Sequence, residues 1–457
     1  MEVIIMMRKK LLAGVLAFVL ACSVLVGCGS AGGNEQGSDG AGGKTELTLW
    51  STYQTASAVK LDELIAKFNA ENGTYTITQE SGLNASGFRQ KLATSTEEYY
   101  PSLFMGESSA IYEYADASYV KPVQDYLDED SEDWLGGMLE SVRAAYTDTE
   151  GNLVGIPVGV SAKGWMVNVD VLKQAGYTLD DLTSFEKVAQ VAKTAFDKGL
   201  VDYGYTPCTG IEISEMLHYQ GADTYDMDNG HSGDVTKCLY TEGETNAALK
   251  KLVGIYAELF ESGVAMNDLT GVAKGASPFI SGRSLFWSCT SSYVYEFEDV
   301  ELDFEWAFVP YKGVDENAAH QGVAMPEGTG IFIANTGDET EMQGAYEFMK
   351  FLAKPENQIY WSTYRGYTPY TKEALESQEW ITWRDENFPS EAKLEELFSV
   401  VNKDMIFPKV SLTNKLEDTN NSILDGIMTN PKANIDEVIK KAADDLNNSI
   451  KILNMRK

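Results

Sequence analysis

Residues 46–50 read Glu-Leu-Thr-Leu-Trp, and this stretch opens the folded part of the chain. Its strict alternation of polar and apolar side chains predicts a β-strand. A helix is expected next, because apolar residues recur there at helical spacing: Leu61, Leu64, Ile65 and Phe68. Asn72 and Gly73 should end that helix, and residues 75–79 alternate again as a second strand. A strand, a helix and a strand in this order favour an α/β fold.

The alternation typical of strands and the spacing typical of helices recur along the chain. A short helix is predicted over residues 86–94 and an apolar strand over 102–105, followed by a loop of the kind that binds ligands in α/β sheets. Further strands are predicted at 153–158, 284–287 and 304–309, and three apolar stripes predict helices within 185–196, 249–260 and 435–450. The whole chain is therefore predicted to be α/β.

Composition limits the classes of partner. The chain has 457 residues with 36 Lys and Arg against 69 Asp and Glu, a formal net charge of −33. A surface this acidic repels phosphate backbones and anionic lipids, so it argues against nucleic acid and favours a neutral or cationic ligand. The length allows two or three domains. Five cysteines without a CxxC pair predict neither a disulfide scaffold nor a cysteine zinc site; Cys208 and Cys238 could pair or stay free.

The N-terminus has the pattern of an export signal. Three basic residues at 8–10 precede an apolar run at 11–26, so residues 1–27 are interpreted as a signal peptide. Residues 25–28 (LVGC) resemble a bacterial lipoprotein box, which implies lipidation of Cys28 and an anchor on the extracellular face of the cell membrane. A plain signal peptide with an incidental cysteine is the alternative. Residues 28–44, rich in glycine, are expected to form a flexible linker.

Seven segments carry a resemblance to a known family. They are 47–53 (LTLWSTY), 119–127 (YVKPVQDYL), 151–170 (GNLVGIPVGVSAKGWMVNVD), 220–222 (QGA), 279–286 (FISGRSLF), 344–358 (GAYEFMKFLAKPENQ) and 366–372 (GYTPYTK). In this order the chain resembles the extracellular solute-binding proteins of bacterial ABC importers, which bind carbohydrates, and its layout is closest to the glycerol-3-phosphate-binding branch. The resemblance implies a monomeric binding protein without enzymatic activity or cofactor that serves the permease subunits of an importer.

The resemblance also implies two discontinuous α/β lobes, residues 45–158 with 328–370 and residues 159–327 with 371–457, joined by hinge segments around a ligand cleft. Glycines 155, 159, 328 and 330 suit a hinge, although ordinary turns would use them too. A sugar needs flat aromatic faces and polar side chains around its hydroxyls. The candidate ligand residues are Trp50, Tyr53, Glu107, Ser108, Ser161, Lys163, Trp165, Trp287, Ser291, Tyr293, Thr329, Arg365 and Tyr367. Core packing is the alternative for the aromatics, and a solvated carboxylate or helix cap for Glu107.

Two departures from the family pattern bear on the ligand. Residues 407–412 (FPKVSL) lack the arginine expected there in glycerol-phosphate binders, and residues 207–210 (PCTG) lack a stacking aromatic. Both favour an unphosphorylated neutral saccharide over a phosphorylated polyol. A surface-anchored glycoside hydrolase is the other alternative. Residues 226–230 (DMDNG) resemble the start of a calcium loop, but the glycine comes one residue early and Lys237 stands where a glutamate is needed, so a tight turn without metal is expected.

Overall fold

The computed structural model describes residues 43–130, 132–268, 273–297, 300–400 and 407–455. The chain divides into two units, Met1–Gly43 and Lys44–Lys457. The predicted signal peptide, Cys28 and all of the predicted linker except Gly43 and Lys44 lie outside the described residues. The fold described below is that of the unit Lys44–Lys457.

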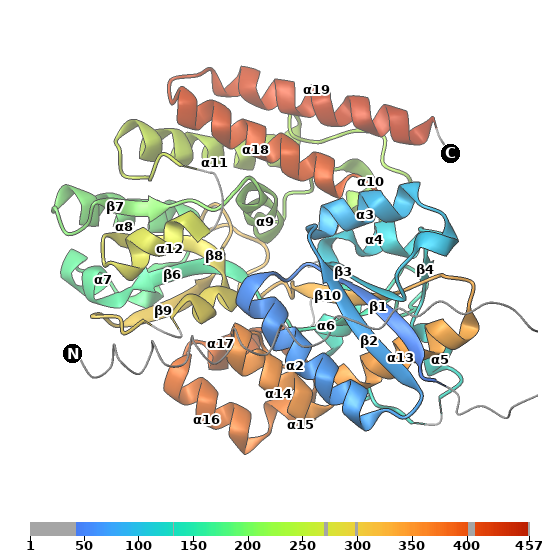
Figure 1. Ribbon diagram of the computed structural model, residues 1–457. Coiled ribbons are helices and arrows are strands. Elements are labelled where there is room, and N and C mark those ends of the chain that lie inside the picture. Colours follow the sequence, from blue (N-terminus) through green and yellow to red (C-terminus); the bar gives the residue numbers. More distant parts are fainter. Residues whose placement is uncertain (1–42, 131, 269–272, 298–299, 401–406, 456–457) are drawn as a thin grey trace, which may run out of the picture. The chain divides into compact units, whose positions relative to one another are not determined.

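Two separate sheets organise this unit (Figure 1). The first has six strands in the order β2-β1-β3-β10-β4, with β5 also paired to β10, and the second has four in the order β7-β8-β6-β9. The strands of the first sheet are β1 (Thr45–Ser51), β2 (Tyr75–Ser81), β3 (Leu103–Glu107), β4 (Val120–Lys121), β5 (Ile156–Pro157) and β10 (Thr329–Ala334). Those of the second are β6 (Lys163–Asn168), β7 (Tyr203–Thr206), β8 (Ser284–Thr290) and β9 (Trp306–Pro310).

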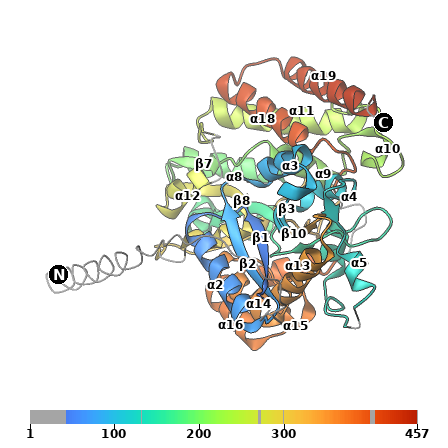
Figure 2. The same ribbon diagram turned by 45° about the vertical axis from the view of Figure 1, so that its right-hand side comes forward.

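Helices surround both sheets. They are α2 (Thr55–Glu71), α3 (Ala85–Thr94), α4 (Ile111–Ala115), α5 (Gln124–Leu127), α6 (Glu140–Ala145), α7 (Val169–Ala175), α8 (Phe185–Asp197), α9 (Ile211–Gln220), α10 (Asp226–Asn229), α11 (Gly243–Glu261), α12 (Ala273–Ile280), α13 (Glu339–Leu352), α14 (Pro355–Arg365), α15 (Lys372–Leu375), α16 (Gln378–Asn387), α17 (Glu391–Phe398), α18 (Thr413–Thr429) and α19 (Ile435–Asn454). Helices α11, α18 and α19 pack together on the second lobe, as Figures 1 and 2 show.

The predicted β-α-β unit is confirmed, and Asn72 explains its boundaries. The backbone N–H of Asn72 donates to the Phe68 carbonyl at 2.8 Å and closes the last turn of α2. Its side-chain Oδ1 accepts from the backbone N–H groups of Thr74 and Tyr75, both at 2.8 Å. One side chain therefore ends the helix and sets the start of β2, which pairs in parallel with β1.

Segments far apart in sequence pair where the chain passes between the sheets. Ser161 and Glu327 exchange two backbone hydrogen bonds, with N···O distances of 2.7 and 2.8 Å. The Val158 N–H donates to the Thr329 carbonyl at 2.8 Å, and the Thr368 N–H donates to the Val160 carbonyl, also at 2.8 Å. The chain crosses between two sheets along adjacent, mutually bonded segments, which is the arrangement of a hinge.

The predicted α/β class with two lobes is confirmed. All strands of the first sheet fall within 45–158 and 328–370, and all strands of the second within 159–327. The predicted strand 153–158 is shorter than expected, because only Ile156–Pro157 pairs with β10. The lobe boundary proposed at residue 371 stays a proposal. Helices α15 and α16 pack on α14, whereas Ser390 accepts from the Phe308 N–H of β9 at 3.0 Å.

Glycine at position 159 is required by close packing in the crossing segment. A Cβ there would lie 2.5 Å from Cγ and 2.7 Å from Cβ of Tyr367, whose side chain is buried. Gly159→Ala should therefore lower the free energy of unfolding by about 1–3 kcal/mol, as overpacked sites do. Urea unfolding measures the change.

Gly254→Ala in α11 is the matched control, because the nearest atom to a Cβ there is Ile435 Cδ1 at 3.9 Å. Alanine in that helix interior should stabilise the protein by up to about 1 kcal/mol. Equal unfolding midpoints for the wild type and Gly159→Ala would contradict the packing argument.

Candidate functional site

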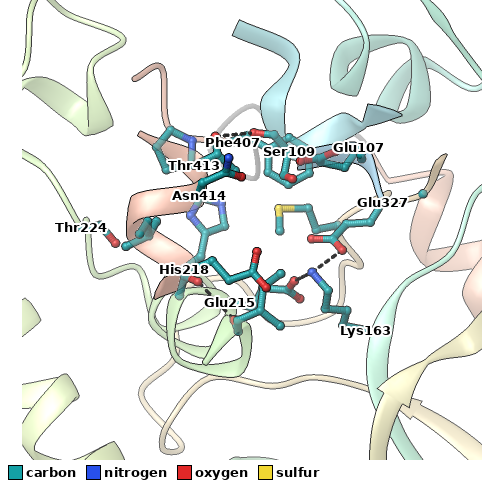
Figure 3. Close-up of a pocket in the computed structure, with 18 of the residues that line it drawn as sticks. Glu107, Ser109, Lys163, Glu215, His218, Thr224, Glu327, Phe407, Thr413 and Asn414 are labelled. Carbon is teal, nitrogen blue, oxygen red and sulfur yellow. Dashed lines mark hydrogen bonds and ion pairs between the residues drawn. The ribbon is translucent and has the colours of Figure 1, made fainter. Parts of the chain in front are cut away.

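A cavity of about 410 Å³ lies between the two lobes (Figure 3). The first lobe contributes residues 84–86 at the start of α3, together with Glu107 at the end of β3 and Ser109 just after it. The second contributes Lys163 of β6, Thr290 at the end of β8, Ser292 just after it, and one face of α9. Residues 327–329 of the crossing segment complete this part of the wall. The volume is in the range of a site for a small organic molecule.

A buried charge cluster occupies the second-lobe side of the cavity. Lys163 Nζ forms ion pairs with Glu215 of α9 and with Glu327, and Figure 3 shows the three side chains pointing toward one another. All three are nearly buried. Burial raises the pKa of the Glu215 carboxyl, and the neighbouring Glu327 raises it further. Burial alone would lower the pKa of Lys163, but the two carboxylates raise it. Lys163 therefore stays charged, and its ammonium is paired with both carboxylates.

A second cluster fixes Glu107 on the first-lobe side. The Arg89 guanidinium pairs with Glu107 and, through Nε, with Glu113 at 3.0 Å. Arg89 is only 5% exposed, which places the cation behind the cavity wall while Glu107 lines the cavity. Burial would lower the pKa of Arg89, but the adjacent acids outweigh it. Glu107 thus reaches the cavity as a carboxylate held by a buried arginine.

The remaining wall of the cavity is formed by the residues just before α18 and in its first turns. Phe407, Pro408, Val410 and residues 412–414, 416 and 417 line the cavity. This segment is held by the turn at α10: the Lys409 N–H donates to the Asn229 carbonyl at 2.8 Å, and a His231 ring nitrogen lies 2.9 Å from the Phe407 carbonyl oxygen. Residues 227–229 all have positive φ, so the expected tight turn is present here as a left-handed one.

Five of the candidate ligand residues line the cavity: Glu107, Ser161, Lys163, Thr329 and Tyr367. At two more positions the lining residue is a sequence neighbour of the candidate. Ser109 lines the cavity while Ser108 is 1% exposed, and Thr290 and Ser292 line it while Ser291 is buried with its Oγ accepting from the Ala162 N–H at 3.2 Å. The predicted loops are at the site, but the side-chain direction differs by one residue.

The predicted tryptophans do not line the cavity. Trp165 and Trp287 are both 0% exposed inside the second lobe, where the Trp165 indole N–H donates to the Tyr205 hydroxyl at 3.2 Å and Tyr293 packs edge-on against Trp287 at 5.4 Å. Trp50 is 4% exposed and stacks on Phe88. All three rings belong to the buried hydrophobic core.

Tyr53, Arg365 and Tyr367 form one cluster beside the hinge. The Arg365 guanidinium lies over the rings of Tyr53, Tyr295 and Tyr367 at 5.4, 4.0 and 5.7 Å. Tyr367 alone of these lines the cavity. Burial would raise the pKa of the Tyr367 hydroxyl, but Arg365 together with hydrogen bonds involving Tyr53 and Thr329 lowers it. Arg365 therefore supports Tyr367 from behind and does not itself face the cavity.

Sequence reasoning missed the polar face of α9 and the segment 407–417. Ile211, Ser214, Glu215 and His218 line the cavity at the spacing of one helical face. The signal available was this spacing of polar side chains on a helix that follows the end of β7. In the segment 407–412, the sequence pattern points only to a missing arginine and not to a cavity wall.

Neither a metal centre nor a membrane span is found in the described part of the chain. No three His, Cys, Asp or Glu side chains there are arranged to hold a metal ion. No helix in the described ranges has the length and apolar character that a bilayer crossing needs. Cys208, Cys238 and Cys289 are buried free thiols, so the possible bond between Cys208 and Cys238 is not present.

Comparison with known proteins identifies relatives of the chain. Residues 63–389 match the family model of bacterial extracellular solute-binding proteins. The sn-glycerol-3-phosphate-binding periplasmic protein UgpB of Escherichia coli strain K12 is 22% identical over 355 residues, which cover 73% of this chain and 76% of that protein.

Solved structures share the fold. UgpB from Mycobacterium tuberculosis in complex with glycerophosphocholine aligns with a TM-score of 0.72 at 16% identity, covering 90% of this chain and 100% of that one. The substrate-binding protein Lmo0181 from Listeria monocytogenes in complex with cycloalternan aligns with a TM-score of 0.70 at 20% identity over the same shares. Maltose-bound MalE3 of T. maritima aligns with a TM-score of 0.71 at 17% identity, covering 90% of this chain and 100% of that one.

Removing the ammonium from the charge cluster should destabilise the protein in a pH-dependent way. Lys163→Met leaves Glu215 and Glu327 buried without their cation, which costs about 3–5 kcal/mol at pH 8. A carboxyl with a raised pKa stabilises the fold when protonated, and that contribution is lost as pH rises through its folded-state pKa. The loss in the variant should therefore be smaller at pH 5 than at pH 8, as measured by chemical unfolding.

Lys173→Met is the matched control, because Lys173 pairs with Glu305 at 2.6 Å on an exposed surface. Exposed pairs contribute little, so stability should hardly change at either pH. A Lys163→Met loss that is the same at pH 5 and pH 8 would contradict the raised pKa of Glu215.

Proposed function

Because the chain belongs to the bacterial extracellular solute-binding protein family, we propose that it captures a neutral sugar or oligosaccharide between its lobes and delivers it to the permease subunits of an ABC importer. The ligand closes the lobes because it contacts both of them only in the closed state. In this proposal the protein binds its ligand without chemical change and is anchored at the extracellular face of the membrane through Cys28.

The charge of the cavity wall carries the proposal. Four acids line it, namely Glu107, Glu215, Glu327 and Glu417, whereas Lys163 is the only Lys or Arg among the described lining residues. A phosphate oxygen about 4 Å from one uncompensated carboxylate is repelled by about 4 kcal/mol at an effective dielectric constant of about 20. Carboxylates are strong acceptors for hydroxyl groups. This lining supports a neutral polyhydroxylated ligand over a phosphorylated one.

Among the four lining acids, Glu417 is the one whose side chain forms no hydrogen bond or ion pair with a described residue. Burial raises the pKa of this carboxyl, an effect that Lys163 only partly offsets. In the proposal Glu107, Ser161, Thr329 and Glu417 accept or exchange hydrogen bonds with sugar hydroxyls, and the Tyr367 ring packs on the sugar face. Lys163 orients Glu215 and Glu327.

A phosphorylated polyol is the second candidate, since the curated relative from Escherichia coli is named for sn-glycerol-3-phosphate. Arg365 is the cation that could serve such a ligand, because it has no ion pair with a described carboxylate. Its guanidinium lies behind Tyr367 and outside the cavity lining, so a phosphate would reach it only after Tyr367 moved.

The proposal is tested by a thermal-shift screen of mono- and oligosaccharides followed by calorimetry, with sn-glycerol-3-phosphate as comparator. A true ligand at 100 times its Kd should raise stability by about 2.7 kcal/mol. Binding of a neutral saccharide with negligible glycerol-3-phosphate binding is expected. Tight, salt-sensitive binding of glycerol-3-phosphate would reverse the choice of ligand.

Glu417→Lys is the charge-swapped variant for the same calorimetry. It should gain affinity for glycerol-3-phosphate because it replaces a repelling carboxylate with a cation. Chromatography of the saccharide after incubation should return it intact, and cleavage products would instead support the hydrolase alternative.

Anchoring is tested separately with Cys28→Ser. The variant should be released from the membrane with unchanged saccharide affinity, because Cys28 lies outside the unit that holds the cavity. Fractionation and calorimetry measure the two properties. A processed variant that stays membrane-bound would exclude the lipid as the anchor.

A further inference from the structure

Helix α18 begins without a cap of its own. Its N-cap residue is Leu412, which has no side-chain acceptor, and its first turn contains no acidic residue. The first N–H groups of a helix have no partner within the helix and normally bond to a capping side chain or water. A protein acceptor for the first N–H groups of α18 must therefore come from another element of the fold.

The acceptor comes from the other lobe. The Thr413 N–H donates to Glu113 Oε1 of α4 at 2.9 Å, and the Thr413 hydroxyl donates to the Ser109 carbonyl at 3.4 Å. A carboxylate at a helix N-terminus is also favoured by the helix dipole. Glu113 belongs to the first lobe, next to β3, while α18 packs on α9, α11 and α19 of the second.

Arg89 adds a second bond across the same junction. Its Nη2 donates to Asn414 Oδ1, the residue after Thr413. Its other nitrogens bind Glu107 and Glu113, both on its own lobe. One buried guanidinium thus orders a cavity carboxylate, the carboxylate that caps α18, and the first turn of α18 itself.

Helix α18 is in turn fixed to the second lobe. Asn421 Oδ1 accepts from the Gly210 N–H at 2.7 Å, and Asn420 Oδ1 accepts from the Tyr240 hydroxyl at 2.8 Å. When the lobes separate, α18 should therefore move with the second lobe and leave Glu113 and Arg89 on the first. The bonds of Thr413 and Asn414 to those residues would then break as the lobes separate.

We propose that Arg89 and Glu113 form an interlobe clasp that caps helix α18 at Thr413 and Asn414 and so holds the lobes closed around the ligand. Glu113 is a positioning residue in this role, because it does not line the cavity. The clasp sets how long the closed form persists. Ligand chemistry is set by the cavity wall.

The test uses Glu113→Ala, with Glu113→Gln as the conservative variant and Asp116→Ala as the control. Asp116 follows α4, is exposed, and has no side-chain hydrogen bond or ion pair with a described residue, so its substitution removes the same charge without touching α18. Small-angle scattering of each protein without added ligand is the first measurement. Glu113→Ala should show a larger radius of gyration than the wild type and Asp116→Ala.

The second measurement is the dissociation rate, by stopped flow, of the neutral saccharide with the largest thermal shift; it rests on the proposed function, whereas the scattering does not. Glu113→Ala should release that saccharide about tenfold faster, equivalent to about 1.4 kcal/mol. Glu113→Gln keeps an oxygen that accepts from the Thr413 N–H. Its dissociation rate should therefore lie between those of the wild type and Glu113→Ala. The association rate should change less than the dissociation rate.

Equal radii for Glu113→Ala and Asp116→Ala would overturn the clasp, as would equal dissociation rates. If Glu113→Ala does not fold, Glu113→Gln decides the question on the same two measurements against Asp116→Ala. A screen that finds no saccharide would count against the proposed ligand, and the scattering comparison would still confirm or overturn the clasp.

Discussion

The antiparallel pairing of Ser161 with Glu327 is the constraint from which the site follows. Two segments separated by more than 160 residues are locked by hydrogen bonds of 2.7 and 2.8 Å as the chain passes from one sheet to the other. Lys163 comes two residues after Ser161 at the start of β6, so the pairing delivers its ammonium to Glu327. Thr329 comes two residues after Glu327 at the start of β10, so it faces the same cavity.

The charge balance at this junction supports the proposed preference for a neutral ligand. The ammonium of Lys163 stabilises Glu215 and Glu327 but leaves no cation for a third negative group. Arg89 does the same for Glu107 and Glu113 from behind the wall. Each buried cation is used to hold carboxylates in place, and held carboxylates are suited to bind hydroxyl groups because little ordering remains to be done on binding.

Sequence patterns predicted the elements better than they predicted side-chain directions. The β-α-β unit at 45–81 could be foreseen because its periods of 2 and 3.6 are local, and Asn72 marks its turning point. Ser108 and Ser291 were one residue away from the lining positions, because a short 3₁₀ turn follows each strand end and turns the next side chain inward. Asn414 reaches the cavity only because α18 packs on α9, where Asn420 and Ser214 bond across 206 positions of sequence, and no local pattern encodes that contact.

The bonds that cross the cleft at α18 differ in kind from those that build its walls. Both acids of Arg89 lie on its own lobe, and its bond across the cleft goes to the neutral amide of Asn414, just as Glu113 accepts from a backbone N–H. A fully paired charge across the lobes would be costly to separate. Shifting a two-state protein from 1% closed to 99% closed takes about 5.5 kcal/mol in total. Bonds from charged to neutral groups, at about 1.5–3 kcal/mol each, supply part of this energy, so the clasp raises the closed population without ligand and the ligand completes closure.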